Sequence, residues 1–154
     1  MAILYREAQL SDIPELEIIR GAVTENVLSN PALVTTADYV EYLTRRGKGW
    51  VATTANGAVV GFAIADLLEH NIWALFLLPE YAAQGIGKRL HALMLDWYFM
   101  QTTHPVWLST DSGTRAETFY RRQGWRETGR TGSGEVRFEM TVEEWNIYRS
   151  NILV

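Results

Sequence analysis

Two glycines, Gly85 and Gly87, stand where an apolar run ends and an amphipathic helical pattern begins. The apolar run covers residues 72–78, and the helical pattern that follows carries Leu90 and Leu93 on one face. The first turn of a helix has backbone N–H groups without intrahelical partners, and the helix dipole adds positive charge there. Because glycine has no Cβ, an anion can approach these N–H groups closely. The pattern therefore predicts a phosphate-binding strand, loop and helix.

Two well-known phosphate loops fit this stretch poorly. A P-loop needs a serine or threonine after its lysine, whereas Arg89 follows Lys88, so no hydroxyl is available to bind magnesium. A dinucleotide-binding loop needs a third glycine, where this chain has Leu90, and an early parallel βαβ unit. A nicotinamide dehydrogenase is therefore the weakest of the functions considered.

The composition is that of a globular enzyme or binding domain. The chain has 154 residues, of which 47% are hydrophobic, so we expect one domain over residues 1–154 that buries a core without covalent staples. Cysteine is absent, which excludes disulfides and thiolate chemistry. Because the three histidines show no metal-ligand spacing, we expect no metal site. The net charge of −4 argues against nucleic acid and favours an amine-bearing partner.

The N-terminus lacks the charged start, apolar core and cleavage site of a signal peptide. The apolar runs at residues 58–65 and 72–78 are far shorter than the roughly 20 residues that span a bilayer. We therefore expect a cytoplasmic protein that has no membrane contact.

The order of the predicted elements indicates the fold. Strands are expected at residues 3–8, 50–54, 59–65, 72–78, 105–110, 125–130 and 135–140. Helices are expected from residue 11 to between Leu28 and Pro31, from Gly87 through Trp97, and at residues 35–47, 115–123 and 143–150. Because a helix joins the strands at 72–78 and 105–110, these two should be parallel. We predict an α/β (α+β) fold with a mixed, mostly antiparallel sheet of about seven strands, flanked by helices, with one parallel βαβ crossover.

Two motifs carry a family resemblance. Except at its first position, residues 82–87 match a loop of Arg or Gln, two residues, Gly, one residue, then Gly or Ala. Residues 116–125 match a helix motif of Ala, two residues, Phe-Tyr, three residues, Gly and an aromatic residue. With these motifs in order, and with the same succession of elements over nearly the whole chain, the protein resembles the GNAT acyltransferase superfamily. Members of that superfamily use acetyl-coenzyme A to acylate amines.

The resemblance implies a binding mode for acetyl-coenzyme A as co-substrate. Backbone N–H groups from Gln84 to Arg89 are expected to hold the pyrophosphate. The strand before the loop is expected to splay from its neighbour and pair with the pantetheine arm, and an N–H near Leu77 to polarise the thioester carbonyl. The implied cofactor-binding residues are Leu75, Phe76, Leu77, Gln84, Gly85, Ile86, Gly87, Lys88, Arg89 and Tyr120. Two residues depart from the family pattern: Ala82 replaces the usual Arg or Gln, and Gly113 stands where an Asn often contacts pantetheine.

The resemblance also assigns the reacting groups. Tyr120 is expected to protonate the departing thiolate, and a hydrogen bond suffices because the coenzyme A thiol is more acidic than a phenol. An amine with a pKa of about 10.4 must lose a proton before it attacks. Glu69 and His70, just before the central strand, are the candidate bases, and Glu25 is the next. Glu25, Asn26 and Trp73 are the candidate acceptor-binding residues.

We predict an N-acetyltransferase that moves an acetyl group from acetyl-coenzyme A to a primary amine by direct attack in a ternary complex. The departures at Ala82 and Gly113 favour an alternative, a non-catalytic sensor or interaction module that binds acyl-coenzyme A. The sequence leaves the acceptor open between a small amine, an antibiotic, a peptide N-terminus and a protein lysine. Apolar groups in the last helix and tail are expected to pack on the core or to form a homodimer contact.

Overall fold

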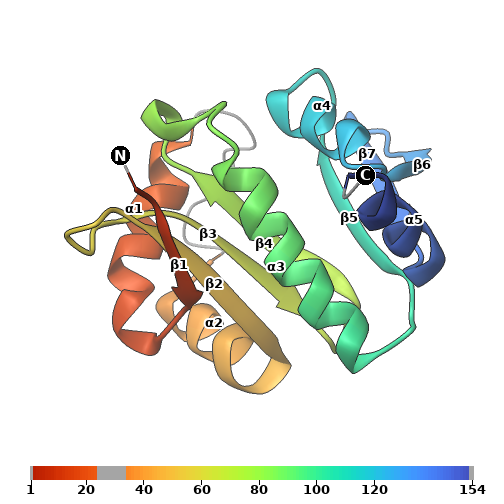
Figure 1. Cartoon of the computed structure of the whole chain (residues 1–154). Coiled ribbons are helices and arrows are strands. Elements are labelled where there is room, and N and C mark those ends of the chain that lie inside the picture. The colour runs from red at the N-terminus through yellow and green to blue at the C-terminus, as the bar shows by residue number, and fades with distance from the viewer. Residues whose placement is uncertain (1, 24–33, 153–154) are drawn as a thin grey trace.

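The computed structural model describes residues 2–23 and 34–152, and these form a seven-stranded sheet with helices on both faces (Figure 1). The strands are β1 (Leu4–Glu7), β2 (Gly47–Thr53), β3 (Val59–Asp66), β4 (Asn71–Leu77), β5 (Val106–Asp111), β6 (Arg126–Arg130) and β7 (Glu135–Met140). The helices are α1 (Ile13–Ala22), α2 (Thr36–Glu41), α3 (Ile86–Gln101), α4 (Arg115–Arg122) and α5 (Val142–Ile152), with shorter helical turns at η1 (Leu10–Asp12), η3 (Tyr42–Arg46) and η4 (Pro79–Tyr81).

The predicted fold class is confirmed. The strand order is β1-β2-β3-β4-β5-β7-β6, and every neighbouring pair is antiparallel except β4 and β5, which α3 connects. The predicted hairpin between β2 and β3 also forms, with Gly57 at a φ of 90°. Helix α1 ends at Ala22, and its expected end near residues 28–31 lies outside the described residues.

Strands β4 and β5 separate from each other along most of their length. They share one register pair, Asn71 with Trp107, at the start of β4, where the Trp107 N–H donates to the carbonyl of His70 at 3.0 Å. Opposite β3, Ile72 and Ala74 occupy successive register positions, so Trp73 between them forms a β-bulge. A bulge bends its strand. Because β4 and β5 pair only at one end, the sheet is split into a β1–β4 half and a β5–β7–β6 half (Figure 1).

Each face of the sheet has its own hydrophobic core. The cluster on the α1 and α2 face includes Leu16, Tyr39 and Phe62. The cluster on the α3 face takes in residues of both halves of the sheet, with α3, α4 and α5 all contributing. Strand β3 is buried along its whole length, whereas the end of β4 is only partly buried. In the described part of the chain, no helix has both the length and the apolar character that a bilayer-crossing helix needs.

Candidate active site

The loop between β4 and α3 uses two left-handed residues to open the helix. Gly85 is the N-cap of α3 with a φ of 83°, and Ala83 two positions earlier has a φ of 62°. A left-handed alanine costs about 1–2 kcal/mol, so the surrounding packing must hold it there. No heavy atom outside its neighbours lies within 4 Å of a Cβ built at Gly85, and one built at Gly87 meets only the Phe119 ring, at 3.7 Å. The first turn of α3 is therefore open on this side.

The first intrahelical hydrogen bond identifies which N–H groups are free to bind a ligand. The Arg89 N–H donates to the Gly85 carbonyl at 3.1 Å. Three backbone N–H groups before it, those of Ile86, Gly87 and Lys88, have no partner within the helix. The prediction that the Arg89 N–H faces a phosphate is corrected by this bond.

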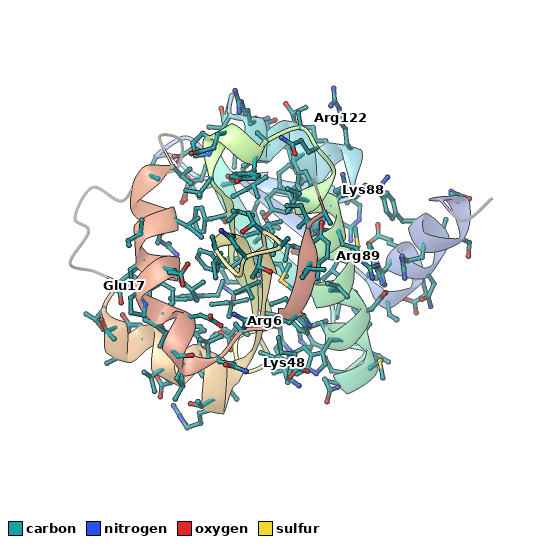
Figure 2. All side chains as sticks on the ribbon, turned by 60° about the vertical axis from the view of Figure 1, so that its left-hand side comes forward. Arg6, Glu17, Lys48, Lys88, Arg89 and Arg122 are labelled. Atoms are coloured by element: carbon teal, nitrogen blue, oxygen red, sulfur yellow. The ribbon has the colours of Figure 1, made fainter. Side chains whose placement is uncertain are left out.

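The side chain of Arg89 also points away from the loop. Its guanidinium lies beside β1, 5.9 Å from the centre of the Tyr5 ring, whereas Lys88 lies on the same side of the molecule as Arg122 (Figure 2). Of the other predicted loop residues, Gln84 is exposed and the Ile86 side chain is buried in the core. Ile86 can therefore contribute to an anion site only through its backbone.

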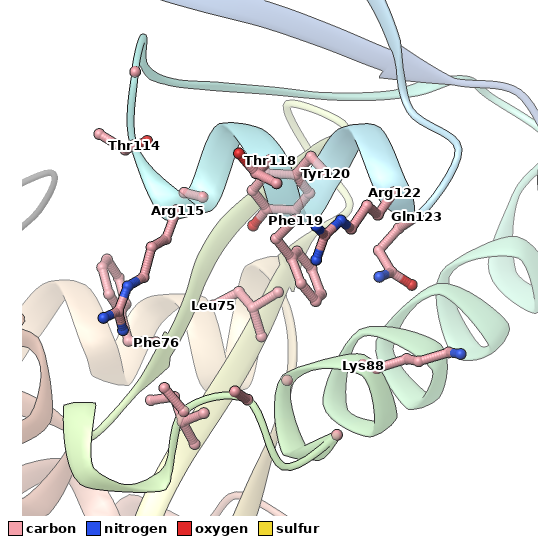
Figure 3. A pocket seen from close by; sticks show the side chains of 17 residues that line it. Leu75, Phe76, Lys88, Thr114, Arg115, Thr118, Phe119, Tyr120, Arg122 and Gln123 are labelled. Carbon is pink, nitrogen blue, oxygen red and sulfur yellow. The ribbon is translucent and has the colours of Figure 1, made fainter.

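A cavity of about 690 Å³ lies between the free end of β4, the loop and α4 (Figure 3). It brings together most of the residues that the sequence predicted for the cofactor. These are Leu75, Phe76, Leu77, Gly85, Gly87, Lys88 and Tyr120. Because β5 has already diverged at this point, the backbone of β4 from Leu75 onward has no pairing partner on that side. The cavity thus offers a row of backbone donors and acceptors that leads to the open turn of α3.

Cations surround the cavity, and the described residues that line it include no carboxylate and no histidine. The basic residues are Lys88 on α3 together with Arg115 and Arg122 on α4. This arrangement favours a ligand with several negative charges. Sequence reasoning missed the two arginines. Their spacing of seven residues, which places both on one face of a helix with Phe119 between them, was the signal that could have found them.

Tyr120 closes the end of the cavity opposite the loop. Figure 3 shows Tyr120 and Phe119 extending from α4 toward Leu75. The Tyr120 ring is buried among aromatic rings, with the centroid of Trp125 at 5.7 Å and that of Phe138 at 6.3 Å. Burial raises the pKa of its phenol well above the ordinary value, so the hydroxyl stays protonated at neutral pH. It is a hydrogen-bond donor at the edge of the cavity.

The structure does not bring Glu69 and His70 together with Tyr120. Both residues precede β4, whereas the cavity lies at the other end of that strand. The five residue steps from His70 to Leu75 span roughly 16 Å. The Glu69 carbonyl accepts from the Trp107 indole N–H at 2.9 Å, and the His70 ring stacks on His104 at 3.7 Å. These residues attach the start of β5 to β4 and do not line the cavity.

Of the predicted acceptor residues, Trp73 lies outside the cavity lining. Trp73 stacks on Tyr42 with 4.0 Å between ring centroids and meets the edge of Tyr39 at 5.1 Å. It belongs to the packed cluster on the α1 and α2 face. Glu25 and Asn26 lie outside the described residues.

The two departures from the family motifs are both at the cavity. Ala82 lines it with a methyl group, so no long side chain from this position reaches a ligand. Gly113 has a φ of 78° in the turn before α4, and its N–H donates to the Glu117 carboxylate at 2.8 Å. This bond and Arg121 hold the pKa of Glu117 below its usual range. Gly113 therefore helps to start α4 rather than offering a side chain to a ligand.

Comparison with known proteins supports the reading of the two motifs. The sequence profile of the Acetyltransferase (GNAT) family matches residues 19–125. The chain is 32% identical to the peptidyl-lysine N-acetyltransferase YjaB of Salmonella typhimurium over 110 residues, which are 70% of this chain and 70% of that protein.

Two solved structures share the fold. PaiA N-acetyltransferase from Thermoplasma acidophilum, solved in complex with coenzyme A, aligns with a TM-score of 0.78 and 18% identity over 92% of this chain and 99% of that chain. The ribosomal-protein-S18-alanine N-acetyltransferase from Escherichia coli aligns with a TM-score of 0.73 and 17% identity over 92% of this chain and 94% of that chain.

Proposed function

The chain belongs to the GNAT acetyltransferase family, and we propose that it transfers acetyl from acetyl-coenzyme A directly to a primary amine within a ternary complex. The family uses acetyl-coenzyme A and acts on amine acceptors. The observation that carries the proposal is the cavity of about 690 Å³, which joins the open turn of α3, the unpaired backbone of β4 and the hydroxyl of Tyr120.

We assign the anionic end of the co-substrate to the loop. The N–H groups of Ile86, Gly87 and Lys88 would hold the pyrophosphate, where the helix dipole favours negative charge by about 0.3–2 kcal/mol. Arg115 and Arg122 on the facing helix add positive charge. Because these groups come from two sides of the cavity, the backbone and the arginines together can compensate for the missing side chain at residue 82.

We assign the middle of the cavity to the amide-bearing pantetheine arm. The backbone of β4 at Leu75 and Leu77 would pair with those amides as a neighbouring strand does. The Leu77 N–H is the candidate to polarise the thioester carbonyl. Acetyl-coenzyme A supplies the activated acetyl group there. A strand that β5 has left unpaired is suited to this task because its hydrogen-bonding groups are available without any rearrangement.

The neutral acceptor nitrogen attacks the carbonyl carbon and a C–N bond forms. The adduct then gives its extra nitrogen proton to water, the C–S bond breaks, and coenzyme A leaves as the thiolate. Tyr120 donates a hydrogen bond to the departing sulfur, and the buried phenol is suited to this because it stays protonated. No carboxylate or imidazole belongs to the described residues that line the cavity. We therefore propose that the amine loses its proton to water before it attacks, a reaction path that needs neither Glu69 nor His70.

For the acceptor we propose the side-chain amine of a lysine in a peptide or protein. The support is the relative named as a peptidyl-lysine N-acetyltransferase, which aligns with this chain over 110 residues. A lysine amine with a pKa of about 10.4 is neutral in only about one molecule in 2,500 at neutral pH. When water takes the proton, the rate therefore rises with pH up to the pKa of the amine.

The test separates catalysis from binding. Isothermal titration should find that the protein binds acetyl-coenzyme A, and a thiol-release assay should find turnover with a lysine-containing peptide. Peptides with an N-terminal alanine but no lysine, and small polyamines, serve as competing acceptor classes. Absence of binding would refute the family-based site, whereas binding without thiol release from any acceptor would favour the sensor alternative. Turnover with polyamines alone would refute the lysine assignment.

A further inference from the structure

One buried histidine spans the boundary between the two halves of the sheet. His91 lies on α3, about one turn beyond Gly87, and is 1% exposed. Helix α3 packs on β2, β3 and β4, whereas α4 packs on β5. His91 therefore belongs to the half that carries the anion-binding turn.

The neighbours of His91 come from the other half. Its ring meets four aromatic rings with centroid distances between 5.4 and 6.3 Å. They belong to Phe119, Tyr120, Trp125 and Trp145. A hydrogen bond joins the two sides as well, because the Trp125 indole N–H donates to Nε2 of His91 at 2.8 Å. Within the described part of the chain, this is a direct polar link between α3 and the segment that follows α4.

Trp125, the partner of His91, is in direct contact with Tyr120. The backbone N–H of Trp125 donates to the carbonyl of Tyr120 at 3.1 Å, and the rings of these two residues lie 5.7 Å apart. Gly124, with a φ of 88°, ends α4 and turns the chain so that Trp125 faces α3. A displacement of Trp125 would therefore move the end of α4 that carries Tyr120.

The bond requires a histidine without a proton on Nε2. Full burial among apolar rings lowers the pKa of His91 to about 3, so the imidazole is neutral at physiological pH and Nε2 can accept. Removing the acceptor would leave a buried indole N–H without a partner, because Trp125 is only 4% exposed. The His91 and Trp125 side chains are therefore held in the one arrangement that makes this hydrogen bond.

We propose that His91 is a positioning residue for acetyl transfer, which holds Tyr120 at a set distance from the anion-binding turn of α3 through its hydrogen bond to Trp125. This inference rests on the proposed function. The turn that grips the co-substrate and the hydroxyl that assists the leaving group belong to separate halves of a split sheet. A contact near the site is needed to keep them in register, since β4 and β5 are paired only at the far end of β4.

A second link across the same boundary provides a matched control. Asp96, farther along α3, accepts from the Trp145 indole N–H at 3.0 Å and from Arg149 at 2.7 Å. Asp96 is about 7.5 Å farther from the anion-binding turn than His91, and its partners lie on α5 rather than beside Tyr120. It connects the same two halves without touching the proposed acid.

The experiment compares His91→Phe, which removes the acceptor, with His91→Gln, whose amide oxygen can accept in its place, and with Asp96→Asn. In thiol-release assays we expect His91→Phe to lower kcat by about 10- to 100-fold, because small displacements of reacting groups have effects of this size. The dissociation constant for coenzyme A should change less than kcat does, because the binding turn is in the same half as His91 and only Arg115 and Arg122 lie on the displaced helix. His91→Gln should recover most of kcat, and Asp96→Asn should keep kcat within about threefold.

A double variant separates positioning from simple destabilisation. In a Tyr120→Phe background, His91→Phe should cause little further loss of kcat, because a residue that acts through Tyr120 has nothing left to position. Additive losses, or equal losses in His91→Phe and Asp96→Asn, would overturn the proposal and leave His91 as a core residue. If His91→Phe does not fold, Trp125→Phe breaks the same bond and carries the same expectations.

Wild-type protein that binds coenzyme A but releases no thiol would instead refute the proposed function. In that case, unchanged tryptophan fluorescence in folded His91→Phe would overturn the positioning role by itself.

Discussion

Acidification should destabilise this protein through His91 before most carboxylates are protonated. The imidazole has an ordinary pKa of 6.5 in the unfolded chain, and burial lowers that pKa to about 3 in the folded protein. Below a pH of about 6.5 the unfolded chain therefore binds a proton that the folded protein excludes. The contribution of His91 to stability is complete above this pH and decreases progressively as the pH falls toward 3.

The size of the effect follows from the separation of the two pKa values. A pH of about 5 is about 1.5 units below the pKa of the imidazole in the unfolded chain. Protonation of the unfolded chain therefore lowers the free energy of unfolding by about 2 kcal/mol. A loss of this size is a large part of the total stability of an ordinary domain, which is about 5–15 kcal/mol. It should be visible in any equilibrium unfolding experiment.

The assay is urea unfolding followed by circular dichroism at pH values between about 8 and 5, for the wild type and for His91→Gln. Glutamine does not titrate, so the difference between the two proteins cancels the contributions of other groups, such as the buried Asp12 paired with Arg6. The wild type should lose about 2 kcal/mol more than the variant over this range. Equal losses in the two proteins would refute the conclusion that His91 is held neutral in the folded state.

Three further outcomes test the proposed site. Tyr120→Phe should lower kcat by about 10- to 100-fold while coenzyme A binds with nearly unchanged affinity in isothermal titration, and unchanged turnover would remove Tyr120 from the mechanism. Gly87→Trp should abolish coenzyme A binding because the new side chain enters the cavity, whereas Gly132→Trp in the open β6–β7 turn should bind normally. If Gly87→Trp bound normally as well, the loop assignment would be wrong. With a lysine peptide, the logarithm of kcat/KM should rise with pH at a slope of about one below the pKa of the amine, and a plateau near neutral pH would indicate a base within the enzyme.

The glycine loop before α3 could be predicted because its signal is local. Gly85 adopts a left-handed conformation at the N-cap of α3, where glycine costs least, and the free N–H groups follow from helix geometry alone. The parallel pairing of β4 and β5 was likewise predicted from the helix that connects them. The prediction that the Arg89 N–H is free was wrong, because α3 begins at Ile86, one residue earlier than the sequence indicated.

The prediction for Glu69 and His70 shows a different limit. Their closeness in sequence to the central strand made them candidates, yet the loop follows that strand and these residues precede it. A strand of seven residues spans about 20 Å, so the two ends cannot serve one site. The order of these residues along the chain already indicated that they lie at opposite ends of the strand, and an estimate of the strand length could have excluded Glu69 and His70.

By itself, the sequence determined the family, the order of the elements and the position of the glycine loop before α3, because each depends on residues within a few positions of one another. Only the tertiary structure decided how the sheet splits, since β4 and β5 pair at one end alone. It also decided the role open to His91, whose aromatic neighbours on α4, on α5 and just before β6 are distant in the sequence. Contacts of that kind depend on the packing of whole elements, and a local pattern of residues does not record them.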